Sequence, residues 1–137
     1  MNRLTPRECG KRCREAFGRL KQPEWGRFWL YQRRMGFANH LGMFTLYSDL
    51  HLNNHWWLDV PQEWRDESLV FLLKDGNTAK YAELTTQESK QLFDKLTPNA
   101  QRKINICLPA TGGTPYFVEW PEFPLGSRLN PLPVSFE

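Results

Sequence analysis

The chain has 137 residues, of which 40% are hydrophobic and 24% are charged, and its formal net charge is +3. This composition is typical of one globular domain, and no apolar run approaches the roughly 20 residues that a membrane-spanning helix needs. The amino terminus lacks the apolar core of a signal peptide, and three cysteines are too few for a disulfide framework. We therefore expect a single cytoplasmic domain with reduced thiols and no contact with a membrane.

Positive charge is concentrated at the amino-terminal end of the chain. Residues 1–34 contain ten Lys or Arg and three Glu, a net charge of +7, whereas the remaining eight basic and twelve acidic residues give −4. Such asymmetry indicates that the basic end faces an acidic partner. This partner is nucleic acid, an acidic protein surface or the acidic half of the same chain.

The first expected element is a helix that begins at Pro6. Thr5 is a suitable N-cap, Pro6 suits the first helical position, and Glu8 completes a capping box. The helix ends before Pro23, because the residue before a proline is pushed out of the helical region. On a helical wheel one side is apolar and the opposite side is cationic. The apolar side holds Cys9, Cys13, Ala16, Phe17 and Leu20, and the cationic side holds Arg3, Arg7, Lys11, Arg14 and Lys21.

Residues 24–41 fit either a short helix or a buried strand, and we favour the helix, so that residues 1–41 form a basic helical segment. Strands follow at 43–52, 56–60, 68–74 and 78–84, and we expect an antiparallel meander with a turn at 75–77. The run LVFLL at 69–73 is apolar throughout, which is typical of a central strand covered on both faces. Thr85 and Glu88 form a second capping box and predict a helix over 86–96.

The last expected strands cover 104–108 and 116–120. The four prolines of residues 121–137 predict a tail that is either extended over the surface or partly loose. We therefore expect one α+β domain over residues 1–120, followed by this Pro-rich tail.

The stretch SDLHLNNHWW at 48–57 contains Asp49 and His51 two residues apart after a β-prone run. LYSDLHLN resembles the first motif of the calcineurin-like metallophosphoesterases, in which such a pair binds one of two metal ions. The later Gly-Asp, Gly-Asn-His and Gly-His-x-His motifs of that family are absent from this chain. We therefore expect no metal and no cofactor, and a hairpin with a turn at 53–55.

In this hairpin the side chains alternate between two faces. One face is apolar and buried, with Leu50, Leu52, Trp56, Leu58 and Val60. The other carries Asp49, His51, Trp57 and Asp59, and is either solvated or a contact surface.

The spacings Cys9-x3-Cys13 and His51-x3-His55 offer zinc-type ligands, but both cysteines lie on the apolar side of the first helix, so we favour core packing. Aromatic and basic residues alternate in WGRFWLYQRR at 25–34, which suits single-stranded nucleic acid, although rings at helical spacing more often belong to a core. The candidate partner-binding residues are Arg7, Lys11, Arg14, Arg27, Arg33, Arg34, Trp25, Trp29 and Trp57.

The sequence therefore favours a small non-enzymatic binding protein, regulatory or inhibitory, whose basic Trp- and Arg-rich surface engages nucleic acid or an acidic protein surface. The first alternative is a protein-binding inhibitor or immunity-type accessory protein of a phage or plasmid, without nucleic-acid binding. The second is a small hydrolase-like enzyme that uses His51 with Asp49 or Asp59.

Overall fold

The computed structural model describes residues 4–21, 31–33, 36–38, 43–96, 102–110 and 112–137. Within these residues the strands form a six-stranded sheet, sheet A, in the order β1-β2-β3-β5-β6-β9, and a three-stranded sheet, sheet B, in the order β4-β7-β8. In chain order the elements are α1 (Pro6–Lys21), β1 (Tyr31–Arg33), β2 (Gly36–Ala38), β3 (Met43–Asp49), β4 (His55–Val60), the 3-10 helix η1 (Gln62–Trp64), β5 (Ser68–Asp75), β6 (Thr78–Leu84), α2 (Thr86–Lys95), β7 (Arg102–Cys107), β8 (Tyr116–Phe117), α3 (Leu125–Arg128) and β9 (Asn130–Pro131).

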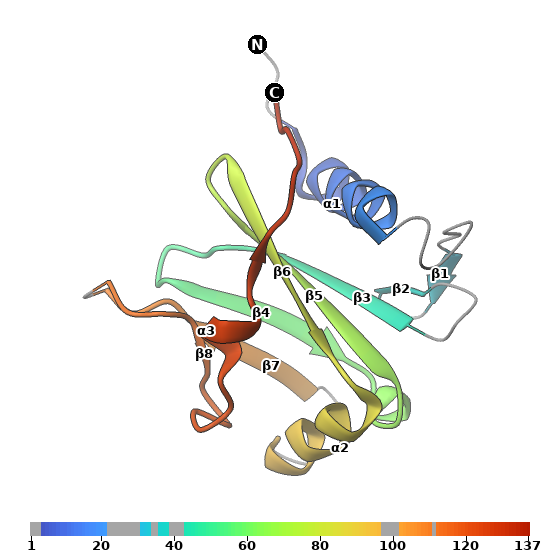
Figure 1. Cartoon of the computed structure of the whole chain (residues 1–137), viewed down its shortest axis with the longest axis vertical. Coiled ribbons are helices and arrows are strands. Elements are labelled where there is room, and N and C mark those ends of the chain that lie inside the picture. Colours follow the sequence, from blue (N-terminus) through green and yellow to red (C-terminus); the bar gives the residue numbers. More distant parts are fainter. Residues whose placement is uncertain (1–3, 22–30, 34–35, 39–42, 97–101, 111) are drawn as a thin grey trace.

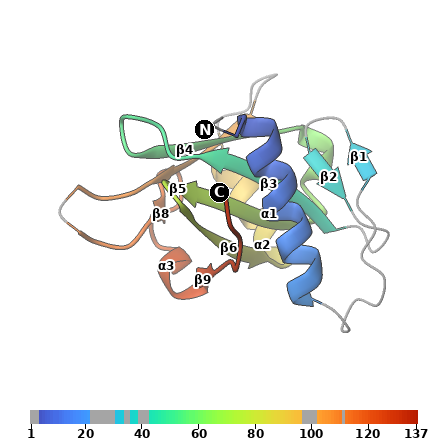
Figure 2. The same cartoon turned by 90° about the horizontal axis from the view of Figure 1, so that it is seen from above.

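Sheet A is the middle layer of the fold (Figure 1). On one of its faces, Cys13 and Phe17 of α1 form a buried cluster with Val70 and Leu72 of β5 and with Leu132, which follows β9. Figure 2 shows α1 lying across the strands of this sheet. On the opposite face, sheet B and α2 enclose a larger core that includes Phe44, Leu58, Phe71, Leu92 and Ile106. The prediction of an α+β domain with a basic helix packed on a sheet is confirmed.

The helix α1 begins where the sequence predicts. The Glu8 amide donates a hydrogen bond to Thr5 Oγ1 at 3.1 Å, which satisfies one of the amides that the first turn of a helix leaves free. The predicted apolar side is buried as far as Phe17, which is fully inaccessible. Leu20 belongs to the same side of the wheel but is 41% exposed, so the buried stripe is shorter than predicted.

The strand β5 is the central strand that the run LVFLL predicts. Leu69, Phe71 and Leu73 face sheet B, whereas Val70 and Leu72 face α1, so both faces of the strand are buried. β5 pairs in parallel with β3 and antiparallel with β6. The turn to β6 has Gly76 with a φ of 60° at its first central position, where a side chain would be strained.

The meander predicted for residues 43–84 is confirmed only for the β5–β6 hairpin and is wrong for the two earlier strands. β3 pairs with β2 and β5, whereas β4 leaves sheet A and pairs with β7 in sheet B. A meander would place β4 between β3 and β5, where both faces of the sheet are covered. The side chains of β4 instead alternate between buried and accessible positions, which suits a sheet with one uncovered face.

The predicted side-chain alternation of β4 is nevertheless confirmed. Trp56, Leu58 and Val60 are each less than 5% exposed, while Trp57 is 38% exposed. Asn54 has a φ of 63° in the preceding turn, in line with the tolerance of asparagine for this conformation. Leu52 was expected in the core and is fully exposed, because it lies in this turn and not in a strand.

The helix predicted over 24–41 is wrong at residues 31–33 and 36–38, which form the strands β1 and β2. The rest of that range lies outside the described residues. The backbone of β2 pairs with the edge of β3, through Phe37 with Thr45 and Ala38 with Phe44. This pairing satisfies polar backbone groups of β3 that a helix would leave open.

The second predicted helix is confirmed as α2, with both hydrogen bonds of the capping box between Thr85 and Glu88. Residues 121–137 contain α3 and β9, and β9 pairs with β6 at the edge of sheet A. These residues contribute Phe123, Leu125 and Leu132 to the buried clusters.

Candidate partner-binding surfaces

The cationic side of α1 retains only part of the charge that the sequence places there. Arg7 and Lys11 are exposed, and Lys11 lies 4.0 Å from Glu15 in a weak surface pair. Arg19 is exposed as well. These three side chains form what we call the α1 cationic surface.

The other basic residues of α1 take part in contacts within the fold. Arg14 was expected on the solvated side, but it is half-buried and its guanidinium lies 3.6 Å from the centre of the Phe37 ring. Burial lowers the pKa of Arg14 from its ordinary value. Arg12 donates to the carbonyl oxygens of Ser135 and Glu137 at 2.9 and 3.0 Å. Lys21 forms a 2.7 Å ion pair with Glu83.

The remaining predicted residues are not gathered on α1. Trp25, Arg27, Trp29 and Arg34 lie outside the described residues, and Arg33 belongs to the edge strand β1. Trp57 lies on the accessible side of β4. Sheet A lies between sheet B, to which β4 belongs, and α1 (Figure 1). Among the described residues, Arg7 and Lys11 therefore lie on one side of the molecule and Trp57 on the opposite side.

The strand register defines the outer face of sheet B. Along β4 every second side chain points away from the core, and the residues that pair with them on β7 and β8 point the same way. Val118 extends this face, because its amide donates to the Asn105 carbonyl at 2.9 Å. We call this face the sheet B surface; it consists of His55, Trp57, Asp59, Lys103, Asn105, Cys107, Tyr116 and Val118.

Aromatic residues and their hydrogen bonds order the centre of the sheet B surface. His55 Nδ1 and Asn105 Oδ1 are 2.5 Å apart, and the His55 ring stacks on Trp57 with ring centres 5.6 Å apart. Asn105 is only 8% exposed under these rings, whereas Trp57 and Val118 are 38% and 40% exposed. The hydrogen bond with the Cys107 thiol raises the pKa of Tyr116 above its ordinary value.

The two surfaces differ in their electrostatics. The sheet B surface contains one acidic and one basic residue, Asp59 and Lys103, which are opposite each other in the register of β4 and β7. Its formal charge is therefore zero when His55 is neutral. A neutral aromatic surface suits a protein partner better than a polyanion, because phosphate recognition depends on clustered positive charge.

Asp49 and His51, the residues of the phosphoesterase-like motif, lie in different environments. Tyr47 Oη donates to Asp49 Oδ1 at 2.8 Å, and Lys74 Nζ lies 3.5 Å from the same oxygen, while His51 is exposed in the turn. Burial and this hydrogen bond raise the pKa of Tyr47. The Asp49 carboxylate thus holds the two neighbouring side chains in place.

The structure also places the other residues considered as ligands or catalysts. Cys9 and Cys13 are buried beneath α1, as expected for core packing. Asp59, the other proposed partner of His51, lies on the sheet B surface. In the part of the chain that the structure describes, no group of three or more His, Cys, Asp or Glu is arranged to hold a metal ion.

The sequence did not identify most of the sheet B surface. Asn105, Cys107, Tyr116 and Val118 lie on two strands whose alternation is visible in the sequence, with Ile104 and Ile106 between them. This pattern indicates that the residues share a face, but only the register of β4, β7 and β8 brings them beside Trp57. Pairing between strands some 50 residues apart cannot be read from local alternation.

No helix in the described part of the chain is long and apolar enough to span a bilayer. Comparison with protein-family models, with curated proteins and with solved structures finds no match to this chain.

Proposed function

We propose that the chain is a small non-enzymatic binding protein that docks on another protein through the sheet B surface. The observation that carries this proposal is the pair of exposed apolar side chains, Trp57 and Val118, on a sheet face whose other side closes the main core. Outward strand positions in a half-buried sheet are normally polar, and an exposed tryptophan there is typical of a binding hot spot.

The composition of this surface indicates the chemistry of the partner. Its centre is aromatic and aliphatic, with Asp59 and Lys103 at one end, an arrangement like the apolar core and polar rim of protein interfaces. The His55 ring and Asn105 hold Trp57 from below, which lowers the entropy that the indole loses on binding. The expected partner therefore presents an uncharged apolar patch that accepts the Trp57 indole.

Site-specific photo-cross-linking in cells that naturally produce the chain tests this proposal. The cross-linker replaces Val118 in one variant and Tyr116 in a second, and the control carries it at Leu20, an equally exposed apolar residue on the opposite side of the molecule. We expect the same protein to be captured from both sheet B positions and not from Leu20.

The captured protein is then purified and titrated with the unmodified chain. Trp57→Ala should weaken this binding about tenfold or more, and Leu20→Ala should leave it unchanged. Equal capture at the three positions, or equal binding by the wild type and Trp57→Ala, would contradict the proposal.

A second candidate function is binding of an acidic partner such as nucleic acid by the α1 cationic surface. It is favoured by the exposure of Arg7, Lys11 and Arg19 in the segment that has a net charge of +7. It has less support than the sheet B surface, because Arg12, Arg14 and Lys21 are engaged within the fold. The hydrolase alternative has still less support, because Asp49 Oδ1 already accepts a hydrogen bond from Tyr47 and forms an ion pair with Lys74.

A further inference from the structure

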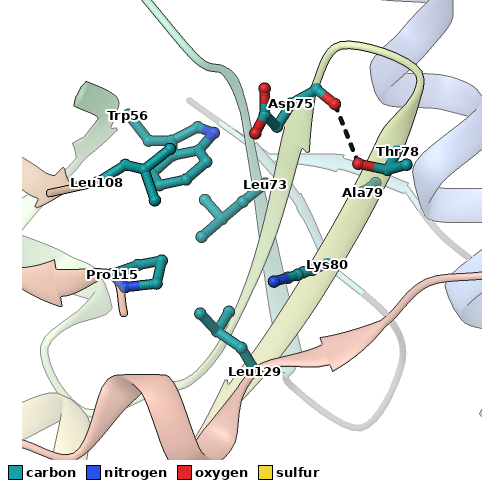
Figure 3. A pocket seen from close by; sticks show the side chains of 9 residues that line it. All are labelled: Trp56, Leu73, Asp75, Thr78, Ala79, Lys80, Leu108, Pro115 and Leu129. Carbon is teal, nitrogen blue, oxygen red and sulfur yellow. Dashed lines mark hydrogen bonds between the residues drawn. The ribbon is translucent and has the colours of Figure 1, made fainter. Parts of the chain in front are cut away.

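A cavity of about 130 Å³ opens between the two sheets, at the end where the β5–β6 turn approaches the segments flanking β7 and β8 (Figure 3). Its lining is about equally apolar and polar: Trp56, Leu73, Leu108, Pro115 and Leu129 form the apolar part, and the polar part comes from the β5–β6 hairpin. A cavity of about 150 Å³ accepts benzene, so the volume of this space is close to that needed by one ring or a branched four-carbon group.

The mouth of this cavity carries a lysine on the face of β6 that becomes apolar further along the strand. Lys80 lies on the face of β6 that points toward sheet B, where the next two residues of the same face, Ala82 and Leu84, are buried in the core. In Figure 3 its ammonium group points toward the cavity. Lys80 is itself exposed, as are Asp75 and Thr78 on the same face, so the charged groups lie at the solvent-facing mouth and the apolar groups lie deeper in the cavity.

Asp75 provides the opposite charge at the same mouth. Register places Asp75 beside Thr78 and Leu73 beside Lys80, so these four side chains share one face of the β5–β6 hairpin. The Thr78 hydroxyl donates to the Asp75 carbonyl at 3.0 Å, which fixes the turn and leaves the Asp75 carboxylate free of that contact. Among the described residues, no ion pair within 4.0 Å joins Lys80 to Asp75.

We propose that this cavity binds a free α-amino acid with an apolar side chain of the size of leucine or phenylalanine. The side chain enters the space beside Trp56 and Leu108, the α-carboxylate pairs with Lys80, and the α-ammonium pairs with Asp75. A zwitterion with an apolar branch uses both charges and the apolar walls at once, whereas a simple acid or amine leaves one charge at the mouth without a counterpart.

This site goes beyond the proposed docking function and is separate from the sheet B surface. Trp56 and Trp57 are neighbours on β4 and point to opposite faces of sheet B. The Trp56 indole donates its N–H to the Lys74 carbonyl at 3.0 Å, so its ring presents an apolar wall to the cavity and no free donor. Failure of either proposal therefore leaves the other intact.

Calorimetric titration of the full chain with three probes tests the assignment. The probes are L-leucine, 4-methylpentanoate, which lacks the ammonium group, and 3-methylbutylamine, which lacks the carboxylate. We expect saturable binding of one L-leucine per chain, with the other two compounds at least about tenfold weaker, the loss typical of a missing charge-assisted hydrogen bond.

Two variants and a control assign the charges. Lys80→Met should weaken L-leucine and 4-methylpentanoate but not 3-methylbutylamine, and Asp75→Asn should weaken L-leucine and 3-methylbutylamine but not 4-methylpentanoate. Lys95→Met, which removes an exposed lysine of α2 away from the cavity, should change none of the three. Absence of saturable L-leucine binding, or L-leucine binding that both cavity variants leave unchanged, would overturn the proposal.

Discussion

Trp56 and Trp57 are adjacent in the chain but lie in opposite environments, since Trp56 is 4% exposed in the core and Trp57 is 38% exposed on the sheet B surface. Trp56 packs between the two sheets and donates to the Lys74 carbonyl, whereas Trp57 stacks on His55 at the surface. The period of two along β4 separates a structural tryptophan from the one that we assign to partner binding.

Truncation of the two tryptophans should therefore have unequal effects on stability. Trp56→Ala removes a buried side chain and leaves a cavity, so it should lower the free energy of unfolding by about 3–5 kcal/mol. Trp57→Ala should lower it by about 1 kcal/mol or less, because it removes one partly exposed stacking contact. Urea unfolding of both variants measures the difference, and equal losses would contradict the register of β4.

Charge reversal should distinguish Arg14 from Arg7, although both come from the predicted cationic side of α1. Arg14→Glu removes the contact with Phe37 and half-buries a carboxylate, so it should destabilise the fold by about 1–3 kcal/mol. Arg7→Glu should change stability by no more than about 0.5 kcal/mol, because Arg7 is exposed. Thermal unfolding of the two variants at equal ionic strength provides the comparison.

Stability should depend on pH through Glu88. Burial acts to raise the pKa of Glu88, but hydrogen bonds from Arg128 and Thr85 outweigh burial and lower it below its ordinary value of 4.5. The charged form is therefore favoured in the folded state, and this contribution is present above pH 4.5 and lost as the pH falls through the folded pKa.

The difference in stability between the wild type and a variant with an amide in place of this carboxylate should show this pH dependence. Glu88→Gln should destabilise the protein by about 0.5–1 kcal/mol at neutral pH, and its difference from the wild type should shrink in acid. Gln preserves the capping box, but its amide nitrogen cannot accept from Arg128, so the variant removes the ion pair together with one of its hydrogen bonds. Glu122→Gln is the control at an exposed carboxylate, and denaturant midpoints across this pH range give the result. A difference that stays constant in acid would rule out the pairing with Arg128.

The three cysteines should differ in their reactivity with Ellman's reagent. Burial, followed by the nearby Cys9 and Asp49, raises the pKa of Cys13 to about 12, and Cys9 is only 4% exposed. Cys107 is partly accessible on the sheet B surface. We expect one thiol to react quickly in the folded protein and two more only after denaturation, and Cys107→Ser should abolish the fast reaction. Rapid reaction of all three would contradict the packing of α1.

The α1 cationic surface has its own test. If it binds nucleic acid, the double variant Arg7→Glu/Lys11→Glu should lose affinity for a fluorescent oligonucleotide, and the control Lys95→Glu/Lys103→Glu, with the same change in charge, should not. The affinity of the wild type should fall with salt at a logarithmic slope of about −0.7 to −0.9 per phosphate contact. Equal effects of the two variants in fluorescence anisotropy would show that α1 has no special role.

Local signals in the sequence determined the elements whose formation depends on neighbouring residues. The caps at Thr5 and Thr85 predict the starts of α1 and α2, because a side-chain oxygen three residues before an amide satisfies it within one turn. The unbroken run at 69–73 predicts a strand covered on both faces, and alternation in β4 separates Trp56 from Trp57. Each of these features depends on a period or a spacing of a few residues.

Only the tertiary structure decided which strands pair and which charged residues remain exposed. Alternation in β4 is equally compatible with a hairpin to β3 and with pairing to β7, and the choice depends on burial of both faces of sheet A by α1 and sheet B. Likewise, the wheel placed Arg14 with Arg7, but contact with Phe37 on β2 removed Arg14 from the cationic surface. The physical reason is that periodicity specifies the direction of a side chain from its own element, whereas exposure depends on what distant parts of the chain pack beside it.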